Sequence, residues 1–339
     1  MLAKTHPADI AAPVDLGVNM LNAYACQNGR LHRLAPEEAA DAIWFDLENP
    51  APEEYAFVAR ITGFLLPQQE DLAEIESSSR LAVDDDILTL SMPIVTRARG
   101  VLEAGVCGFV LSPKYLVTLR FAPSILFNQF NTAAPPENVP GSAHIFTGLL
   151  EAIIDRQADS LEKLREELDH LSHRVFHHRR GSQTPARNAE RELQAILITL
   201  GRDYDAISYL RDAQLGVARI APYATAAVEW MPKPVRDRLK SVQRDVSSLN
   251  EFSTHLTDKV QFLLDSTLGF INIAQNSLIK VLTIVSIMGI PPTLIAGIYG
   301  MNFHDIPELS WHYGYAYAWA AMIISAVAPL VWFRKKGWI

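Results

Sequence analysis

Cysteine is scarce in this chain, which excludes two common kinds of site. The 339 residues include only Cys26 and Cys107, and these form no Cys-x-x-Cys spacing. Neither a zinc site nor a redox motif is indicated, and we expect both thiols to be buried and reduced. The first residues, Met1 to Leu21, also lack a long apolar core after Lys4. They do not resemble a signal peptide, so we expect the large N-terminal region to remain in the cytoplasm.

Enzyme motifs and a basic surface are missing as well. The chain has no P-loop Gly-x-x-x-x-Gly-Lys-[Ser/Thr], no nucleophile elbow and no His-Glu-x-x-His. Its 30 basic and 38 acidic side chains give a formal net charge of −8, which does not suit a nucleic-acid-binding protein. We therefore expect neither an enzyme nor a nucleic-acid partner. Such mild acidity is usual in soluble domains, and it would also suit a cytoplasmic domain that collects divalent cations.

Charge is absent from two long runs near the C-terminus. Val281–Tyr299 and Tyr315–Phe333 contain no Asp, Glu, Lys or Arg. A membrane-spanning helix needs about 20 mostly apolar residues. Both runs are therefore predicted to be transmembrane helices that contact lipid, rather than core helices of a soluble domain. Since two helices cannot enclose an ion path alone, a pore would require several copies around an axis.

The flanking charges predict the orientation of these runs. Lys280 precedes the first run and basic residues at 334–336 follow the second, whereas the loop at 300–314 has Asp305 and Glu308 but no Lys or Arg. Positive flanks stay inside, so both termini are predicted to be cytoplasmic and the loop external. Aromatic side chains that could form the two interfacial belts are Trp311, Tyr313, Tyr315 and Tyr317 outside, and Trp332 and Trp338 inside.

The region before these runs is predicted to be a mixed α/β domain. Asn28-Gly29 is a two-residue hairpin signal, a helix is expected over 52–63, and a Pro-rich linker covers 131–141. We expect strands at 24–27, 30–34, 42–47, 87–96, 105–111 and 115–121. The fold class is therefore α+β, with a mixed sheet and flanking helices, plus a long stalk helix and the two transmembrane helices.

Three long helices are predicted after the linker. The first covers 143–178 and the second 186–220, with prolines at 222, 232 and 234 interrupting the chain. The third carries an apolar seam at steps that average about 3.5 residues: Val235, Leu239, Val242, Val246, Leu249, Phe252, Leu256, Val260 and Leu263. We expect it to run on to Tyr299, about 100 Å at 1.5 Å per residue. That length argues against an ordinary bundle helix inside one subunit.

These features predict the following organisation. A flexible N-terminus covers 1–19, the α/β domain 20–141, the helical region 142–233, the stalk 234–280, the first transmembrane helix 281–300, the external loop 301–313, the second transmembrane helix 314–333 and the basic tail 334–339.

Short motifs surround the first apolar run. The chain reads Gly300-Met301-Asn302-Phe303 at its outer end, followed by Ile306-Pro307-Glu308-Leu309. Pro291-Pro292-Thr293-Leu294 lies inside the run, 269–272 reads Gly-Phe-Ile-Asn, and 335–339 reads Lys-Lys-Gly-Trp-Ile. Over about 255–339 the chain thus resembles the CorA family of divalent-cation (Mg²⁺/Co²⁺) transporters. The order of elements upstream agrees, with weaker motifs.

The resemblance implies an architecture and a transport function. It implies a funnel-shaped homopentamer of the inner membrane, whose first transmembrane helix lines the pore while the second packs outside. Gly300, Met301 and Asn302 would form the selectivity filter, with Glu308 in the external loop. Mg²⁺ would be the transported and regulatory ion, with Co²⁺ and Ni²⁺ as further cargoes. Influx would be passive and use no catalytic cofactor.

The filter residues suit an ion that keeps its water. Mg²⁺ dehydrates reluctantly, and a ring of neutral Asn302 oxygens could accept hydrogen bonds from its waters while still releasing it. Alternatively, Asn302 could serve only as the C-cap residue of the helix. By position in the family pattern, Asn276 and Thr293 would supply polar rungs to the pore. Candidates for a hydrophobic constriction are Ile279, Leu282 and Ile290, which could equally serve helix or lipid packing.

Gating by cytoplasmic Mg²⁺ is a further expectation from the resemblance. It needs carboxylates that meet across subunits, and Asp84-Asp85-Asp86 is the best local candidate, although such a triplet could be a solvated turn. The stalk partner expected from the family is replaced here by Ser241. Asp245, one turn on, and Asp265 are the substitutes.

Three alternatives stay open. The four histidines at 170, 173, 177 and 178 lie near one helical face and could bind zinc, or simply form a solvated helix end. The chain could be a Zn²⁺ transporter of the ZntB branch, although that branch tends to have Val in place of Met301 and lacks the Pro-Glu-Leu loop. It could also be a sensor that its two spans merely tether to the membrane.

Overall fold

A computed structural model describes residues 21–27, 30–73, 80–98, 101–130, 141–177, 186–301 and 311–337. The chain divides into two compact units: the first unit comprises 1–181 and 197–263, and the second comprises 182–196 and 264–339. Several predicted features lie outside the described residues: the hairpin turn at 28–29, the linker at 131–140, and Asn302, Glu308, His178 and Trp338. The domain boundaries expected from the sequence stay predictions.

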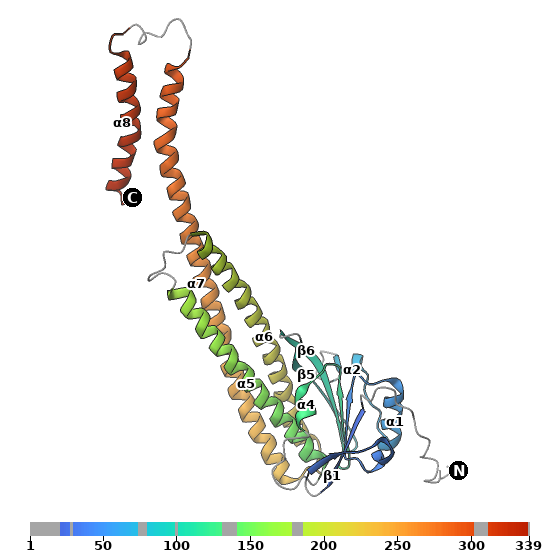
Figure 1. The fold of residues 1–339 in the computed structure, drawn as a ribbon. Helices are drawn as coiled ribbons and strands as arrows, with labels where there is room; N and C mark the ends of the chain where they lie inside the picture. The colour runs from blue at the N-terminus through green and yellow to red at the C-terminus, as the bar shows by residue number, and fades with distance from the viewer. Residues whose placement is uncertain are drawn as a thin grey trace, which may run out of the picture. The chain divides into compact units, whose positions relative to one another are not determined.

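The first unit contains a seven-stranded sheet (Figure 1). Its strands are β1 (Leu21–Gln27), β2 (Arg30–Arg33), β3 (Trp44–Glu48), β4 (Leu81–Asp84), β5 (Ile87–Ala98), β6 (Val101–Leu111) and β7 (Leu116–Arg120). The order is β2-β1-β3-β7-β6-β5-β4, in which β3 and β7 pair in parallel and all other neighbours are antiparallel. The predicted mixed sheet is therefore confirmed, and β4 is an additional strand that we did not predict.

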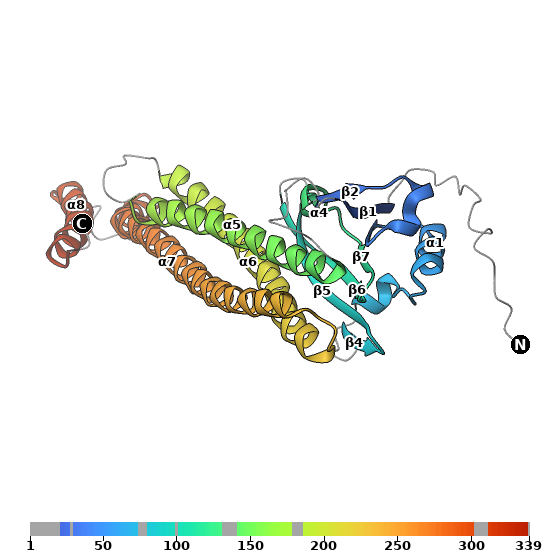
Figure 2. The same ribbon diagram turned by 90° about the horizontal axis from the view of Figure 1, so that it is seen from below.

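Each face of the sheet carries its own apolar core because side chains alternate along a strand. On one face Trp44, Phe109 and Leu116 join residues of the long helices. On the other face Phe45 and Val117 join residues of α1 (Pro52–Thr62) and α2 (Gln69–Ala73). Figure 2 shows the long helices on one side of the sheet and α1 on the other.

Short helices complete the first unit. A 3₁₀ helix covers Pro36–Asp41, and α4 covers Ile125–Phe130. In α1 the side chain of Glu54 accepts a hydrogen bond from the Ala51 N–H, which satisfies one donor at the helix start. Gly63 ends α1 in the left-handed conformation, φ 76°, which favours glycine.

Three long helices follow: α5 (Ser142–His177), α6 (Ala186–Ala227) and α7 (Lys233–Tyr299). The predicted end of α6 near Ile220 is wrong, because the helix continues through Pro222. Ala221 and Ala224 on either side of Pro222 are buried. This packing stabilises the helix despite the hydrogen bond that proline cannot donate.

The predicted seam of α7 is mostly buried, with Leu249 and Phe252 half-buried, but its partners differ from the expectation. Val235, Leu239, Val242 and Val246 belong to the same core as Ile153 of α5 and Val217 of α6. The Phe176 and Phe262 rings stack with centroids 5.8 Å apart. This part of α7 is thus a bundle helix within the chain, which its length had argued against. The predicted continuous helix to Tyr299 is confirmed.

The second unit contains the end of α7 and α8 (Gly314–Lys335), which runs back alongside it (Figure 1). Both helices are long and apolar enough to cross a membrane. Large apolar side chains on both helices are exposed, among them Leu282, Ile290, Ile324 and Trp319. An apolar surface of this extent favours contact with lipid or with further copies of the chain.

The two cysteines differ from each other. Cys107 is buried, as expected, and burial raises the pKa of its thiol. Cys26 on β1 is only half-buried, so the prediction was wrong for this thiol.

Candidate functional site

The last part of α7 is an uncharged helix that ends at the Gly-Met-Asn motif. It remains helical through Pro291 and Pro292. A proline removes one backbone N–H and crowds the carbonyl four residues earlier. The segment around these prolines therefore stays helical with fewer backbone hydrogen bonds than a proline-free helix of the same length.

The predicted pore-lining residues share one face of this helix. At about 100° per residue, Asn276, Ile279, Leu282, Ile290 and Thr293 fall within an arc of about 120°. All five side chains are exposed, and Leu282 is 68% exposed. A face of this kind is free to line an axis shared with other copies, as the sequence predicted. Its role there stays a prediction.

A shallow apolar groove runs along part of the same helix. Its volume is about 580 Å³, and its lining includes Ile290, Thr293 and Met301 together with Gly289 and Gly297. The Thr293 hydroxyl donates to the Gly289 carbonyl at 2.6 Å. Its proton is thus used within the helix, which leaves the oxygen as an acceptor for a water or an ion-bound water.

The motif begins where α7 ends. The Gly300 N–H donates to the Ala296 carbonyl at 2.9 Å, and the Met301 N–H donates to the Ile298 carbonyl at 3.2 Å. A Cβ atom on Gly300 would lie 3.0 Å from the Ala296 oxygen, so a larger residue would crowd the last turn. Met301 is exposed. Asn302 and Glu308 lie outside the described residues, so the filter assignment stays a prediction.

The predicted regulatory carboxylates do not form a site within the chain. Asp84 ends β4, and Asp85 takes a left-handed φ of 51° in the turn before β5. The Trp230 indole donates to the Asp86 carbonyl at 3.1 Å. Burial raises the pKa of Asp155 on α5, and the charges of nearby carboxylates, Asp245 among them, raise it as well.

No three His, Cys, Asp or Glu side chains are close enough to hold a metal ion within the ranges that the structure describes. This holds for the carboxylates at 84–86, 245 and 265 and for the histidines at 170 and 173. The regulatory site expected from the Asp triplet and the stalk therefore stays a prediction.

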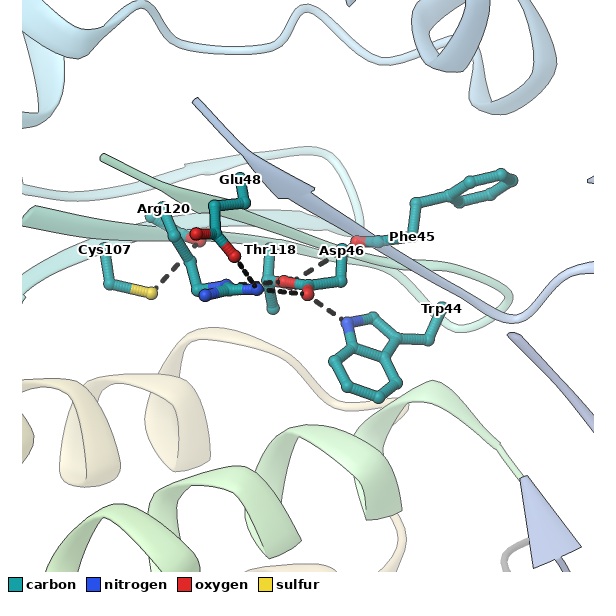
Figure 3. Close-up of polar contacts among 8 residues, drawn as sticks. Trp44, Phe45, Asp46, Glu48, Cys107, Thr118 and Arg120 are labelled. Atoms are coloured by element: carbon teal, nitrogen blue, oxygen red, sulfur yellow. Dashed lines mark hydrogen bonds and ion pairs between the residues drawn. The ribbon is translucent and has the colours of Figure 1, made fainter. Parts of the chain in front are cut away.

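Sequence reasoning missed a polar cluster buried in the sheet (Figure 3). The Arg120 guanidinium donates to both Asp46 carboxylate oxygens, at 2.9 and 2.7 Å, and lies 3.1 Å from Glu48. The Thr118 hydroxyl donates to Asp46 at 2.7 Å and accepts from the Trp44 indole at 3.1 Å. The cluster ties the parallel strands β3 and β7 together, so we assign it a structural role.

Electrostatics agree with that role. Burial alone would lower the pKa of Arg120, but the hydrogen bond and charge of Asp46, with Glu48, raise it. The guanidinium also lies over the Phe127 ring, 4.8 Å from its centroid. The paired contact of Arg120 with the buried Asp46 is therefore an internal bond between the two parallel strands.

Comparisons with known proteins agree on one family. The family model for CorA-like Mg²⁺ transporter protein matches residues 39–335. The chain is similar to the magnesium transport protein CorA of Escherichia coli strain K12, 31% identical over 94% of this chain and all of that one. It is similarly related to that of Yersinia pseudotuberculosis, 32% identical over the same shares.

A solved structure shows the same fold. The complete structure of the CorA magnesium transporter from Methanocaldococcus jannaschii superimposes with a TM-score of 0.74, covering 96% of this chain and 100% of that one. The sequence identity is 18%, so this likeness concerns the fold alone.

Proposed function

The chain belongs to the CorA-like Mg²⁺ transporter protein family, and we propose that it is the subunit of a channel that admits hydrated Mg²⁺ passively to the cytoplasm. The observation that carries the proposal is the exposed, uncharged face of α7, which leads directly into Gly300 and Met301. Membership of this family of ion transporters also supports a role other than catalysis.

The chemistry of this face suits a hydrated ion. Mg²⁺ strongly prefers to keep its water in an octahedral shell, and α7 offers neutral oxygens rather than carboxylates beyond Lys280. Neutral acceptors bind the waters of the ion weakly enough for release. Asn302 at the outer end would accept hydrogen bonds from the shell first, and Thr293 and Asn276 would do so farther along. Ile290, Leu282 and Ile279 would form dry constrictions between them.

The assembly follows from the same face. One α7 cannot enclose an axis, so the pore requires several copies, and we propose five, with α8 outside and contacting lipid. Lys280 and the cations at 334–336 would hold both termini in the cytoplasm of an inner membrane. Co²⁺ and Ni²⁺ would follow the same path. Release of cytoplasmic Mg²⁺ from sites between subunits would open it.

The test is Mg²⁺ flux into liposomes that contain the purified protein. We expect wild type to conduct under a gradient of Mg²⁺ without ATP. Asn302→Ala should reduce flux at least tenfold, because the first acceptors for the hydrated ion are lost. Asn250→Ala, on the part of α7 within the first unit, is the matched control and should conduct normally. Absence of flux in wild type would leave the tethered sensor as the better explanation.

Ion identity needs a separate comparison. The same liposomes loaded with indicators for Mg²⁺, Co²⁺ and Zn²⁺ should show Mg²⁺ and Co²⁺ entry. Entry of Zn²⁺ alone would reject the Mg²⁺ assignment and favour the ZntB alternative.

A further inference from the structure

A polar cavity lies within the first unit, between α5, α6 and β6. Its volume is about 380 Å³, and we call it the α5–α6 cavity. Its charged lining residues are Glu103, Lys163, Glu167, Arg202, Asp203 and Asp205. Four carboxylates and two cationic side chains thus line the cavity, so the formal charge of the lining is −2. A negative cavity attracts positive ligands.

Asp203 is the buried member of this lining. It is 5% exposed, and its Oδ2 atom has no hydrogen-bond partner among the described residues. Glu103, Glu167 and Asp205 are exposed. A buried polar atom without a partner is costly, and such atoms in native proteins usually meet a ligand or water. The unsatisfied oxygen therefore indicates a ligand that donates hydrogen bonds or carries positive charge.

The charges around Asp203 favour a cation over a neutral ligand. Burial and then the charge of Glu167 on α5 together raise its pKa to about 6, while Arg202 opposes the shift. Lys163 on α5, Asp205 and Tyr209 on α6, and Glu103 on β6 also line the cavity. At neutral pH the Asp203 and Glu167 carboxylates repel each other, and a cation between them would relieve this repulsion.

We propose that the α5–α6 cavity binds a hydrated divalent cation within a single subunit. The inference rests on the proposed function only for the identity of the ion as Mg²⁺. No three carboxylates among the described residues are close enough to ligate an ion directly, so the ion would keep its waters. Six waters occupy about 180 Å³ at about 30 Å³ each, which the cavity can hold. Asp203 would accept hydrogen bonds from the shell at the floor, and Glu167 and Asp205 would do so nearer solvent.

The test is amide hydrogen exchange of the purified full-length protein, titrated with Mg²⁺ at constant ionic strength. In wild type, Mg²⁺ should slow exchange at 160–167 and 199–209, which line the cavity. Asp203→Asn should need about tenfold more Mg²⁺ for the same protection, because one charge facing the ion is lost. Asp212→Asn removes a charge from an exposed position of the same helix and should titrate like wild type.

Two further measurements keep the proposal falsifiable. Glu167→Gln changes an exposed residue, so it should fold even if Asp203→Asn does not, and it should weaken protection several-fold. Hexaamminecobalt(III), which cannot exchange its ligands, should protect the same segments. Unchanged Mg²⁺ titrations in both variants, or protection by Mg²⁺ but not by the cobalt complex, would overturn the site as described.

The proposed function is tested separately in the same preparation. Asp203→Asn should conduct Mg²⁺ into Mg²⁺-free liposomes as wild type does, because the substitution lies outside the pore. If wild type shows no Mg²⁺ flux, the channel proposal is rejected. If the variants keep the wild-type Mg²⁺ protection from amide exchange, only the cavity site is rejected.

Discussion

At the scale of single residues, the buried ion pair of Arg120 with Asp46 is an important electrostatic contact of the first unit. Its side chain is completely buried, and it neutralises Asp46, which is also buried, through two hydrogen bonds. Removal of one partner from a buried pair leaves an uncompensated charge, which typically costs about 3–5 kcal/mol. We expect Arg120→Met to lower the free energy of unfolding by about that amount, measured by thermal unfolding of the purified protein.

An exposed ion pair supplies the control for this prediction. Lys240 and Asp237 lie 3.2 Å apart on α7, with both side chains largely exposed. Such pairs contribute about 0–1 kcal/mol, so Lys240→Met should unfold nearly as wild type does. Equal effects of the two substitutions would show that the Asp46 carboxylate finds water or another partner once Arg120 is gone.

Asp203 should make stability depend on pH. Its folded pKa of about 6 lies above the ordinary aspartate value of about 3.9. The folded state therefore binds the proton more tightly, and this stabilisation is complete below about pH 3.9 and lost as the pH rises through 6. Without divalent cations at pH 7.5, the free energy of unfolding of Asp203→Asn should exceed that of wild type by on the order of 1–2 kcal/mol. The difference should shrink towards pH 4.5, whereas Asp212→Asn should show no such trend.

The residues differ in how far the sequence could have revealed them. Gly300-Met301-Asn302 could be proposed because a short motif follows an uncharged run. Asp203 left a weaker signal: it lies three residues after the buried Leu200 and four before the buried Ile207, so a charge interrupts the apolar face of α6. The Asp46–Arg120 pair left none, because 74 residues separate its members and only the parallel pairing of β3 with β7 brings them together.

At the scale of elements, α6 contains two glycines in opposite surroundings. A Cβ atom on Gly216 would lie 2.7 Å from the Cβ of Met92 on β5, whereas one on Gly201 would meet nothing within 4 Å. Gly216→Ala should therefore destabilise the first unit by about 1–3 kcal/mol through overpacking. Gly201→Ala should stabilise it by about 0.5–1 kcal/mol, because alanine favours a helix interior.

Thermal unfolding of both variants beside wild type checks this contrast. The two substitutions are chemically identical and lie in one helix, so helix propensity alone would shift both in the same direction. Opposite shifts show that α6 approaches β5 closely at Gly216. Stabilisation by both would mean that the helix can move away from the sheet at little cost.

Elements with a clear period or a turn signal were predictable, and several short elements without either were not. The periodicity of α5 and α7 extends over many turns, and β5, β6 and β7 alternate clearly, so their positions agree with the structure. Strand β4 and the helices α2 and α4 are four to six residues long, too short to show a period. Pro222 misled the prediction of α6 because a local rule was overridden by packing on both sides of it.

At the scale of the whole molecule, the pattern of α7 specified burial but not the partner. We interpreted the residues from Val235 to Leu263 as a coiled-coil-like seam, and most of them are buried within the chain. Beyond Lys280 the reverse holds, because apolar residues are exposed on all sides. One helix thus has two different surroundings: its first part packs within the chain, and its last part leaves its apolar side chains exposed.

The number of subunits around the exposed face of α7 can be measured directly. Five subunits around the α7 face should give a particle with a protein mass of about 189 kDa, five times the 37.7 kDa of one chain. Native mass spectrometry of the protein released from lipid nanodiscs measures this directly, with the denatured sample as the reference for one chain. A monomer or dimer as the sole species would reject the pore, since neither can surround a water-filled axis with one helix per subunit.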